Sequence, residues 1–157
     1  MKRFAMLLAG MLVAVVGYAQ FEKGKWYVGA SVSGLDISYS GSEEFNIGLD
    51  AKGGYMLADD WMLLGQVGWQ HGESDDLMLG IGGRYYIIQN GLYLGVNAKL
   101  VHRDPKYNDF MPGIEVGYAF FLNKSVTIEP SVYYDQSFKN HSDFSKIGFK
   151  IGVGVYL

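Results

Sequence analysis

KIGFKIGVGVYL, the stretch from Lys146 to Leu157, decides the fold of this protein. Apolar side chains occupy every second position, and lysine, glycine and tyrosine occupy the positions between them. This alternation has the period of a β-strand, in which neighbouring side chains point to opposite faces. The stretch therefore predicts a strand with two chemically different faces.

The same alternation recurs along the chain from Lys25 onward, in runs separated by short turn-rich segments. Asn90-Gly91 is a strong hairpin signal, because both residues tolerate a positive φ. No run of helical period follows the N-terminal region, so the sequence predicts an all-β, eight-stranded antiparallel up-and-down fold. The expected strands are Lys25–Tyr39, Glu44–Leu57, Trp61–His71, Asp76–Ile88, Leu92–His102, Phe110–Leu122, Ser125–Phe138 and Lys146–Leu157.

The N-terminus has the composition of an export signal. Two cationic residues precede an uninterrupted apolar run over residues 4–16, and the small residues Gly17 and Ala19 occupy positions −3 and −1 of a cleavage site. This order is typical of a secretory signal peptide. The run of 13 apolar residues is too short for a transmembrane helix, which needs ~20. We expect residues 1–19 to be a signal peptide and residues 20–157 to form one β-barrel domain.

Composition excludes several classes of protein. The 157 residues include no cysteine, which excludes disulfide scaffolds, thiolate metal sites and a lipidated N-terminal cysteine. A net charge of −3 offers no cationic surface for nucleic acid, so no such partner is expected. With 49 % hydrophobic and only 18 % charged residues, the chain is not disordered.

The positions of the glycines predict which face of the sheet points outward. Glycine is concentrated on the polar face, for example at Gly80, Gly82, Gly152 and Gly154. A soluble, lipocalin-like barrel would expose that face to water, where glycine loses conformational entropy and gains no packing. Inside a narrow closed barrel, small residues are what the geometry requires. The apolar face then meets lipid, and the sheet has to close because every backbone group in lipid needs a partner.

Aromatic residues support this orientation. Tyr55, Tyr85 and Tyr118 stand in the apolar phase shortly before tight turns. Trp61 and Trp69 are eight residues apart, which is ~26 Å along a strand and ~20 Å vertically at a tilt of ~40°. That height is comparable with the ~25 Å apolar band of an outer-membrane barrel. The sequence thus predicts two aromatic girdles on a transmembrane barrel.

These residues resemble the small eight-stranded outer-membrane barrels of OmpA/OmpX type, in particular the porin-family or outer-membrane β-barrel-domain proteins of Bacteroidota. The C-terminal strand carries the most specific likeness, to the signal that is read by the barrel-assembly machinery. Lys150, Gly152, Val155 and Leu157 fit it, although the family usually ends in Phe. The resemblance implies a monomer in the outer membrane of a Gram-negative cell, with both termini in the periplasm. Its implied partners are outer-membrane lipid and lipopolysaccharide, with the assembly machinery acting during biogenesis.

Charged residues on the inward face predict what fills the lumen. An isolated buried charge is very costly, so we expect acids and bases there to pair. An eight-stranded barrel is just wide enough for its own side chains, which predicts a plugged, salt-bridged lumen. The alternative is a narrow conduit gated near Arg84 and Glu129. The ion-pair candidates are the acids Glu44, Asp50, Glu115, Glu129 and Asp135 and the bases Lys52, Arg84, Lys99 and Lys150.

Candidates for catalysis are weak. Some small outer-membrane barrels are lipid A acyltransferases or deacylases that use a His with Ser and an acid at the rim, and this chain offers His71, His102 and the cluster 141–143. Adjacent residues point apart, however, and no oxyanion-stabilising device is visible. Acidic pairs such as Glu43-Glu44 match no calcium-loop motif. We expect no catalytic residues, cofactor or metal, and a lipid A-modifying enzyme remains the alternative.

A structural or surface-interaction role is the function expected from these features. The first, second and seventh runs are longer than the ~9–11 residues that span a membrane, so their ends are expected to project as a small exposed sheet. Such edges can capture a partner strand. The sequence does not identify that partner.

Overall fold

The computed structural model of the chain describes residues 21–38, 43–44, 47–71, 75–87, 90–104, 107–138 and 145–157. Within these ranges no helix has the length and apolar character needed to cross a membrane. The strands are β1 (Trp26–Ser38), β2 (Glu43–Glu44), β3 (Ile47–Ala58), β4 (Trp61–His71), β5 (Asp75–Tyr86), β6 (Leu92–Asp104), β7 (Tyr107–Tyr118), β8 (Phe120–Phe121), β9 (Val126–Asp135) and β10 (Lys146–Tyr156).

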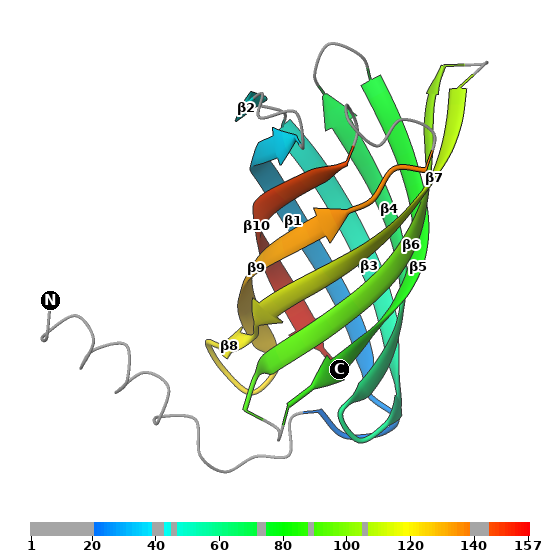
Figure 1. Cartoon of the computed structure of the whole chain (residues 1–157). Helices are drawn as coiled ribbons and strands as arrows, with labels where there is room; N and C mark the ends of the chain where they lie inside the picture. The colour runs from blue at the N-terminus through cyan, green and yellow to red at the C-terminus, as the bar shows by residue number, and fades with distance from the viewer. Residues whose placement is uncertain are drawn as a thin grey trace, which may run out of the picture.

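The long strands close into a barrel (Figure 1). Each is antiparallel to the next along the chain, and β10 completes the ring by pairing with both β9 and β1. The closing ladder runs from Tyr27 opposite Tyr156 to Ser38 opposite Lys146. The two-residue strands β2 and β8 only extend the sheet beside β1 and β9. This confirms the predicted closed, eight-stranded antiparallel barrel.

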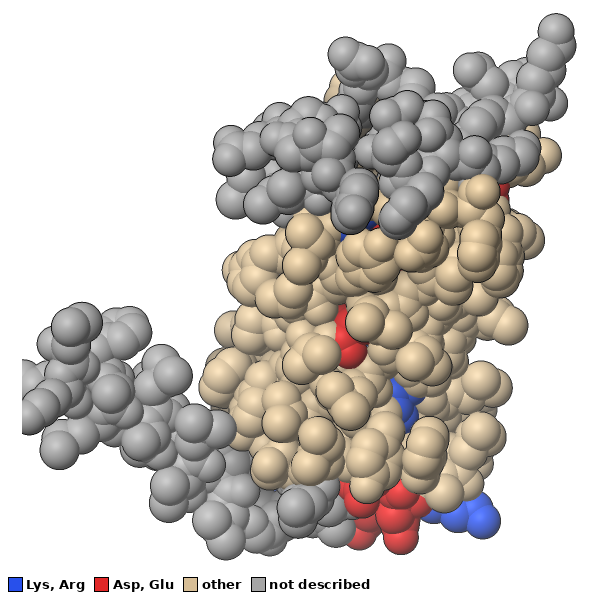
Figure 2. Space-filling view, viewed as in Figure 1, with Lys and Arg blue, Asp and Glu red and all other residues tan. Residues whose placement is uncertain are grey.

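The two faces of each strand are as unlike as their side chains. Along β10, Ile147, Ile151 and Val153 on the outer face are each about half exposed, whereas Lys150 on the inner face is only 4 % exposed. The same alternation holds on β3, β4 and β9. In the view of Figure 2 the wall is formed mostly by uncharged residues, and charged side chains gather at the lower end. The apolar face therefore points outward, as the glycine pattern predicts.

Glycines on the inner face make room for tyrosines of neighbouring strands. A Cβ atom at Gly117 would lie 2.5 Å from Cζ of Tyr93, and one at Gly154 would lie 2.5 Å from Cε2 of Tyr27. Both distances are far below van der Waals contact, so no larger residue fits while the rings stay in place. The inner face is crowded because it lines a narrow cylinder, and glycine lets a large ring lie flat against the opposing backbone.

The two ends of the barrel differ. At one end, called the terminal end below, Trp26 and Leu157 exchange backbone hydrogen bonds of 2.9 and 2.8 Å, beside the short turns after β3, β5 and β8. Exposed aromatic pairs lie near it, with ring centroids 5.0 Å apart for Trp26 and Tyr55 and 4.8 Å apart for Trp61 and Tyr85. The opposite end, called the loop end, carries the stacked pair Phe110 and Phe138.

One predicted loop is a strand hairpin instead. The segment from Arg103 to Asp109 was expected to be irregular, but β6 continues to Asp104 and β7 begins at Tyr107, which pairs with it. This β6–β7 hairpin rises beyond its neighbours in Figure 1. The sequence of this segment no longer alternates between apolar and polar residues, so the ladder continues where the alternation of hydrophobicity has disappeared. The seventh predicted run ends as a strand at Asp135, whereas the strand of the first run continues to Ser38, and residues 45–46 of the second run lie outside the described residues.

Candidate functional site

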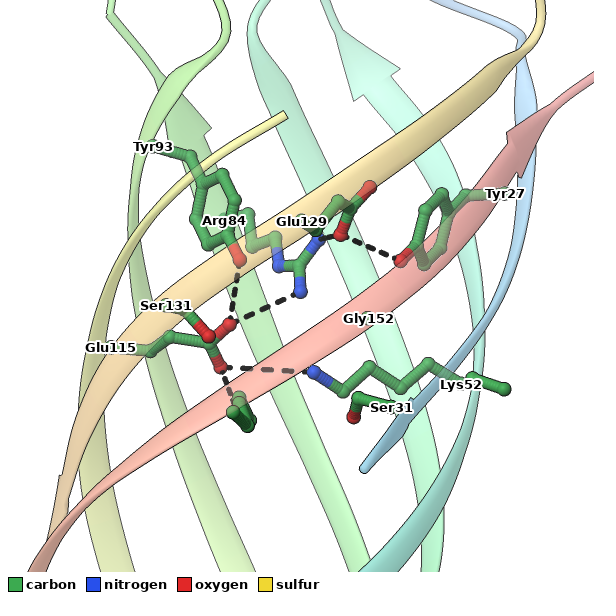
Figure 3. A pocket seen from close by; sticks show the side chains of 11 residues that line it. Tyr27, Ser31, Lys52, Arg84, Tyr93, Glu115, Glu129, Ser131 and Gly152 are labelled. Atoms are coloured by element: carbon green, nitrogen blue, oxygen red, sulfur yellow. Dashed lines mark hydrogen bonds and ion pairs between the residues drawn. The ribbon is translucent and has the colours of Figure 1, made fainter. Parts of the chain in front are cut away.

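Arg84 lies at the centre of the lumen. It points inward from β5, is 2 % exposed, and donates hydrogen bonds to two carboxylates on other strands. Its Nη1 lies 2.7 Å from Oε2 of Glu129 on β9, and its Nη2 lies 3.2 Å from Oε1 of Glu115 on β7. The guanidinium carbon is 4.1 Å from the ring centroid of Tyr93. One cation thus joins three strands across the interior (Figure 3).

Glu115 is shared by three cations. Besides Arg84, its Oε2 lies 2.6 Å from Nζ of Lys150 and 3.8 Å from Nζ of Lys52. The Tyr93 hydroxyl donates to its Oε1 at 2.8 Å. All of these side chains are buried, so the charge is compensated locally by neighbouring protein groups.

Glu129, in contrast, has one cationic partner and several hydroxyl donors within the described part of the chain. Tyr27 donates to Oε2 at 2.9 Å, Thr127 to Oε1 at 2.8 Å, and Tyr156 to Oε1 at 3.2 Å. The ion pairs and hydroxyls around Glu115 and Glu129 together form the Arg84 network, which draws on seven long strands and omits β4. Its members are Tyr27, Lys52, Arg84, Tyr93, Glu115, Thr127, Glu129, Lys150 and Tyr156.

A second ion pair lies on β6 and β9. Nζ of Lys99 donates to Oδ2 of Asp135 at 2.6 Å, and both residues are buried. Asp50 is half-buried and accepts a hydrogen bond from Oγ of Ser31 at 3.4 Å, with no ion-pair partner among the described residues. The side chain of Glu44 lies outside the described residues. The structure therefore brings Lys52, Arg84, Lys99, Glu115, Glu129, Asp135 and Lys150 into buried salt bridges inside the barrel.

Toward the loop end the lumen stays polar. Oγ of Ser137 donates to Oδ2 of Asp109, and the backbone N–H of Ser137 donates to Oγ of Ser145 at 3.0 Å. Lys146 donates to Oε1 of Gln70 at 2.8 Å. Sequence reasoning missed this layer because its members fall in predicted turns or at the ends of predicted strands, where alternation no longer shows which way a side chain points.

Phe21 closes the terminal end, and sequence reasoning missed it as well. It precedes the first strand, yet it is fully buried and its ring stacks on Tyr86 with centroids 3.9 Å apart. Its position two residues after the predicted cleavage site, ahead of the alternating runs, carries no signal that it packs inside.

The predicted rim histidines do not form a shared site in the described structure. His71 on β4 is exposed and stacks on Trp69, and Nδ1 of His102 on β6 lies 2.6 Å from Oδ1 of Asn108. Strand β5 separates the two. His141 and its neighbours 142–143 lie outside the described residues. Among the residues that are described, no group of three or more His, Asp or Glu side chains is placed to hold a metal ion.

The residues of the predicted assembly signal lie on the closing strand β10. Lys150 and Gly152 face the lumen, where Gly152 packs beside Ser31 and Glu129. Leu157 follows the strand and is 69 % exposed. The inward-facing residues of the predicted assembly signal therefore form part of the lumen wall.

The fold is similar to solved outer-membrane barrels. The N-terminal β-barrel domain of Pseudomonas aeruginosa OprF matches with a TM-score of 0.65 at 15 % identity, over 86 % of this chain and 98 % of that one. Neisserial surface protein A matches with a TM-score of 0.60 at 14 % identity, over 85 % and 97 %. The Yersinia pestis outer membrane protein Ail, in a phospholipid bilayer nanodisc, matches with a TM-score of 0.59 at 12 % identity, over 86 % and 100 %.

These likenesses concern the fold, because the identities are low. No curated protein matches the sequence. A family model, described as the outer membrane protein beta-barrel domain, matches residues 5–157. With its closed ring of eight strands and apolar wall, this chain belongs to the outer membrane protein β-barrel domain family.

Proposed function

We propose that this protein is a monomeric, non-catalytic and non-conducting outer-membrane barrel of OmpA/OmpX type, with a structural or surface-interaction role. In this proposal residues 1–19 direct export and are removed, the assembly machinery reads the C-terminal strand, and the terminal end faces the periplasm. The observation that carries the closed lumen is the Arg84 network, which fills the interior with paired charges from five strands and hydroxyl donors that bring in two more.

The network supports closure because displacing it is costly. Removing one member of a buried ion pair typically costs 3–5 kcal/mol, since the remaining charge is left without compensation. A passing ion would have to separate Arg84 from Glu115 or Glu129 and take over their hydrogen bonds. The Arg84–Glu129 pair at 2.7 Å and the Lys150–Glu115 pair at 2.6 Å leave no space between donor and acceptor for a solute.

Planar-bilayer recording tests the closed lumen. The purified barrel is added to a lipid bilayer, and insertion is verified independently by protease protection in vesicles of the same lipid. We expect no stable ohmic step. A reproducible conductance would instead establish the narrow conduit near Arg84 and Glu129 and would refute the plug.

The surface role is supported by the β6–β7 hairpin, which continues as a paired ladder beyond its neighbours. A non-catalytic role is supported by the separation of His71 from His102 by β5. Mass spectrometry of lipid A from cells with and without the gene tests the non-catalytic role. Identical lipid A is expected, and a changed acyl number would establish the enzyme. Surface crosslinking followed by pull-down tests the surface role. We expect the captured partner to be lost when the β6–β7 hairpin is shortened.

A further inference from the structure

The terminal end of the lumen is closed by an aromatic cluster. The Phe21 ring lies 3.9 Å from the Tyr86 ring, centroid to centroid and nearly parallel at 13°. The rings of Phe121 and Tyr156 each stand 5.5 Å away, edge-on. The hydroxyls of Tyr86 and Tyr156 are 2.8 Å apart, which joins β5 to β10 across the opening. Phe21 therefore occupies the middle of the ring that these side chains form.

The backbone around Phe21 is fixed to the turn between β3 and β4. The carbonyl of Phe21 accepts from the N–H of Asp60 at 2.9 Å, and Oδ1 of Asp59 accepts from the N–H of Lys23 at 2.9 Å. The N–H of Gly24 donates to the carbonyl of Met56 at 2.9 Å. Gly24 has a φ of +93°, a conformation that favours glycine and turns the chain back over the barrel mouth.

Two buried methionines extend this cluster into the lumen. Met56 and Met62 are 0 % and 2 % exposed and belong to the same buried core as Phe21 and Tyr86. Tyr156 belongs both to this cluster and to the Arg84 network, because its hydroxyl donates to Oε1 of Glu129 at 3.2 Å. The lumen thus has two adjoining barriers that share Tyr156, an ion-pair network in the middle and a mainly apolar cluster at the terminal end.

We infer that Phe21 is a stopper, held by residues 22–25, that keeps water out of the terminal half of the lumen. This inference rests on the proposed closed lumen and assigns its seal at this end to a residue outside the barrel strands. Removing the ring leaves a hole at the centre of the aromatic cluster, through which water reaches Met56 and Met62. The Arg84 network remains in place, so ion conduction stays blocked when the stopper is removed.

Cysteine labelling tests this directly, because the chain has no cysteine of its own. Met62→Cys and, separately, Met56→Cys are placed in the full-length protein and exposed in detergent micelles to a water-soluble maleimide. With Phe21 present we expect both thiols to be protected. With Phe21→Ala added, we expect each thiol to be labelled about tenfold faster or more, because no ring then covers it and the reagent reaches it without local unfolding.

Phe138→Ala is the matched control, because Phe138 is an aromatic residue on the outer wall, 68 % exposed. It should leave labelling unchanged, and equal acceleration by both variants would overturn the stopper. Far-UV circular dichroism verifies that each variant is folded. Should Phe21→Ala not fold, Asp59→Ala loosens the segment while keeping the ring, and faster labelling is again expected.

The two proposals fail in different ways. Unchanged protection in Phe21→Ala and Asp59→Ala, with a non-conducting wild type, overturns the stopper and leaves the closed lumen standing. A conducting wild type overturns the closed lumen itself. Fast labelling of Met62→Cys with Phe21 intact overturns the seal at the terminal end even where no current flows.

Discussion

Arg84 and Glu129 face each other inside the barrel with Nη1 and Oε2 2.7 Å apart, and each residue is only 2 % exposed. Glu129 has no second cation within the network, whereas Glu115 also contacts Lys52 and Lys150. The two carboxylates therefore depend on Arg84 to different degrees. This difference determines which carboxylate is left without a compensating cation when the guanidinium is removed.

Arg84→Met should destabilise the barrel by about 3–5 kcal/mol, because Glu129 is left as a buried charge with hydroxyl donors alone. Adding Glu129→Gln should recover part of that loss. Urea unfolding in lipid vesicles, followed by tryptophan fluorescence, measures both. Glu22→Gln is the control, since its exposed pair with Lys25 at 3.9 Å contributes at most about 1 kcal/mol. Equal effects of Arg84→Met and Glu22→Gln would show that the network does not support the fold.

Gly117→Ala should cost about 1–3 kcal/mol through overpacking. The new methyl group would lie 2.5 Å from Cζ of Tyr93 and 2.7 Å from Cβ of Ser131. Gly53→Ala is the matched control on the outer face, where the methyl group meets nothing within 4 Å. That variant should be neutral or slightly stabilising, because alanine reduces the freedom of the unfolded chain. The same unfolding assay compares the two, and equal destabilisation would contradict a crowded interior.

Ile81→Arg should destabilise the protein in a bilayer by about 2–4 kcal/mol, because a cation at the bilayer midplane is costly. Ile81 lies midway along β5 on the outer wall and is 70 % exposed in the isolated chain. On a water-facing wall the same substitution would be harmless. Reconstitution yield and urea midpoint in vesicles distinguish the two, and wild-type stability would refute a lipid-facing wall.

Processing after Ala19 should leave a mature chain that begins at Gln20, immediately before Phe21. Export signals are cleaved after a small residue, and Gly17 and Ala19 supply the small residues at positions −3 and −1 directly after the apolar run. Intact-mass measurement of protein purified from the outer membrane reads the cleavage site to a single residue. A mature chain that begins after Phe21 would lack the stopper, and one that keeps residues 1–19 would show that they are no cleaved signal.

Much of the architecture follows from local patterns. The period-two alternation of KIGFKIGVGVYL and its counterparts specifies strands with one apolar face. Glycine on the opposite face indicates that the glycine-bearing face lies inside the barrel. The ring has to close because an unpaired edge is not tolerated in lipid. The alternation also predicts that the side chains of Arg84, Glu115 and Glu129 face the lumen, because it indicates to which face of the sheet each side chain points.

Pairing within the lumen could not be predicted in the same way. Which acid Arg84 meets depends on register and on how the strands are staggered around the ring, and these join residues as distant in sequence as Arg84 and Glu129. The β6–β7 hairpin was missed because a ladder outside the membrane needs no apolar face. Phe21 was missed because its burial depends on aromatic rings from β5, β8 and β10, which come together only when the barrel closes.

The sequence alone determined the strands, their apolar face and the closed eight-stranded barrel, because each of these features follows from a repeating local pattern. Only the tertiary structure decided that Glu115 is shared by three cations, that Glu129 relies on one, and that a residue ahead of the first strand fills the terminal mouth. Those contacts arise when the ring closes and brings distant strands within hydrogen-bonding distance, and no repeating pattern along the chain records them.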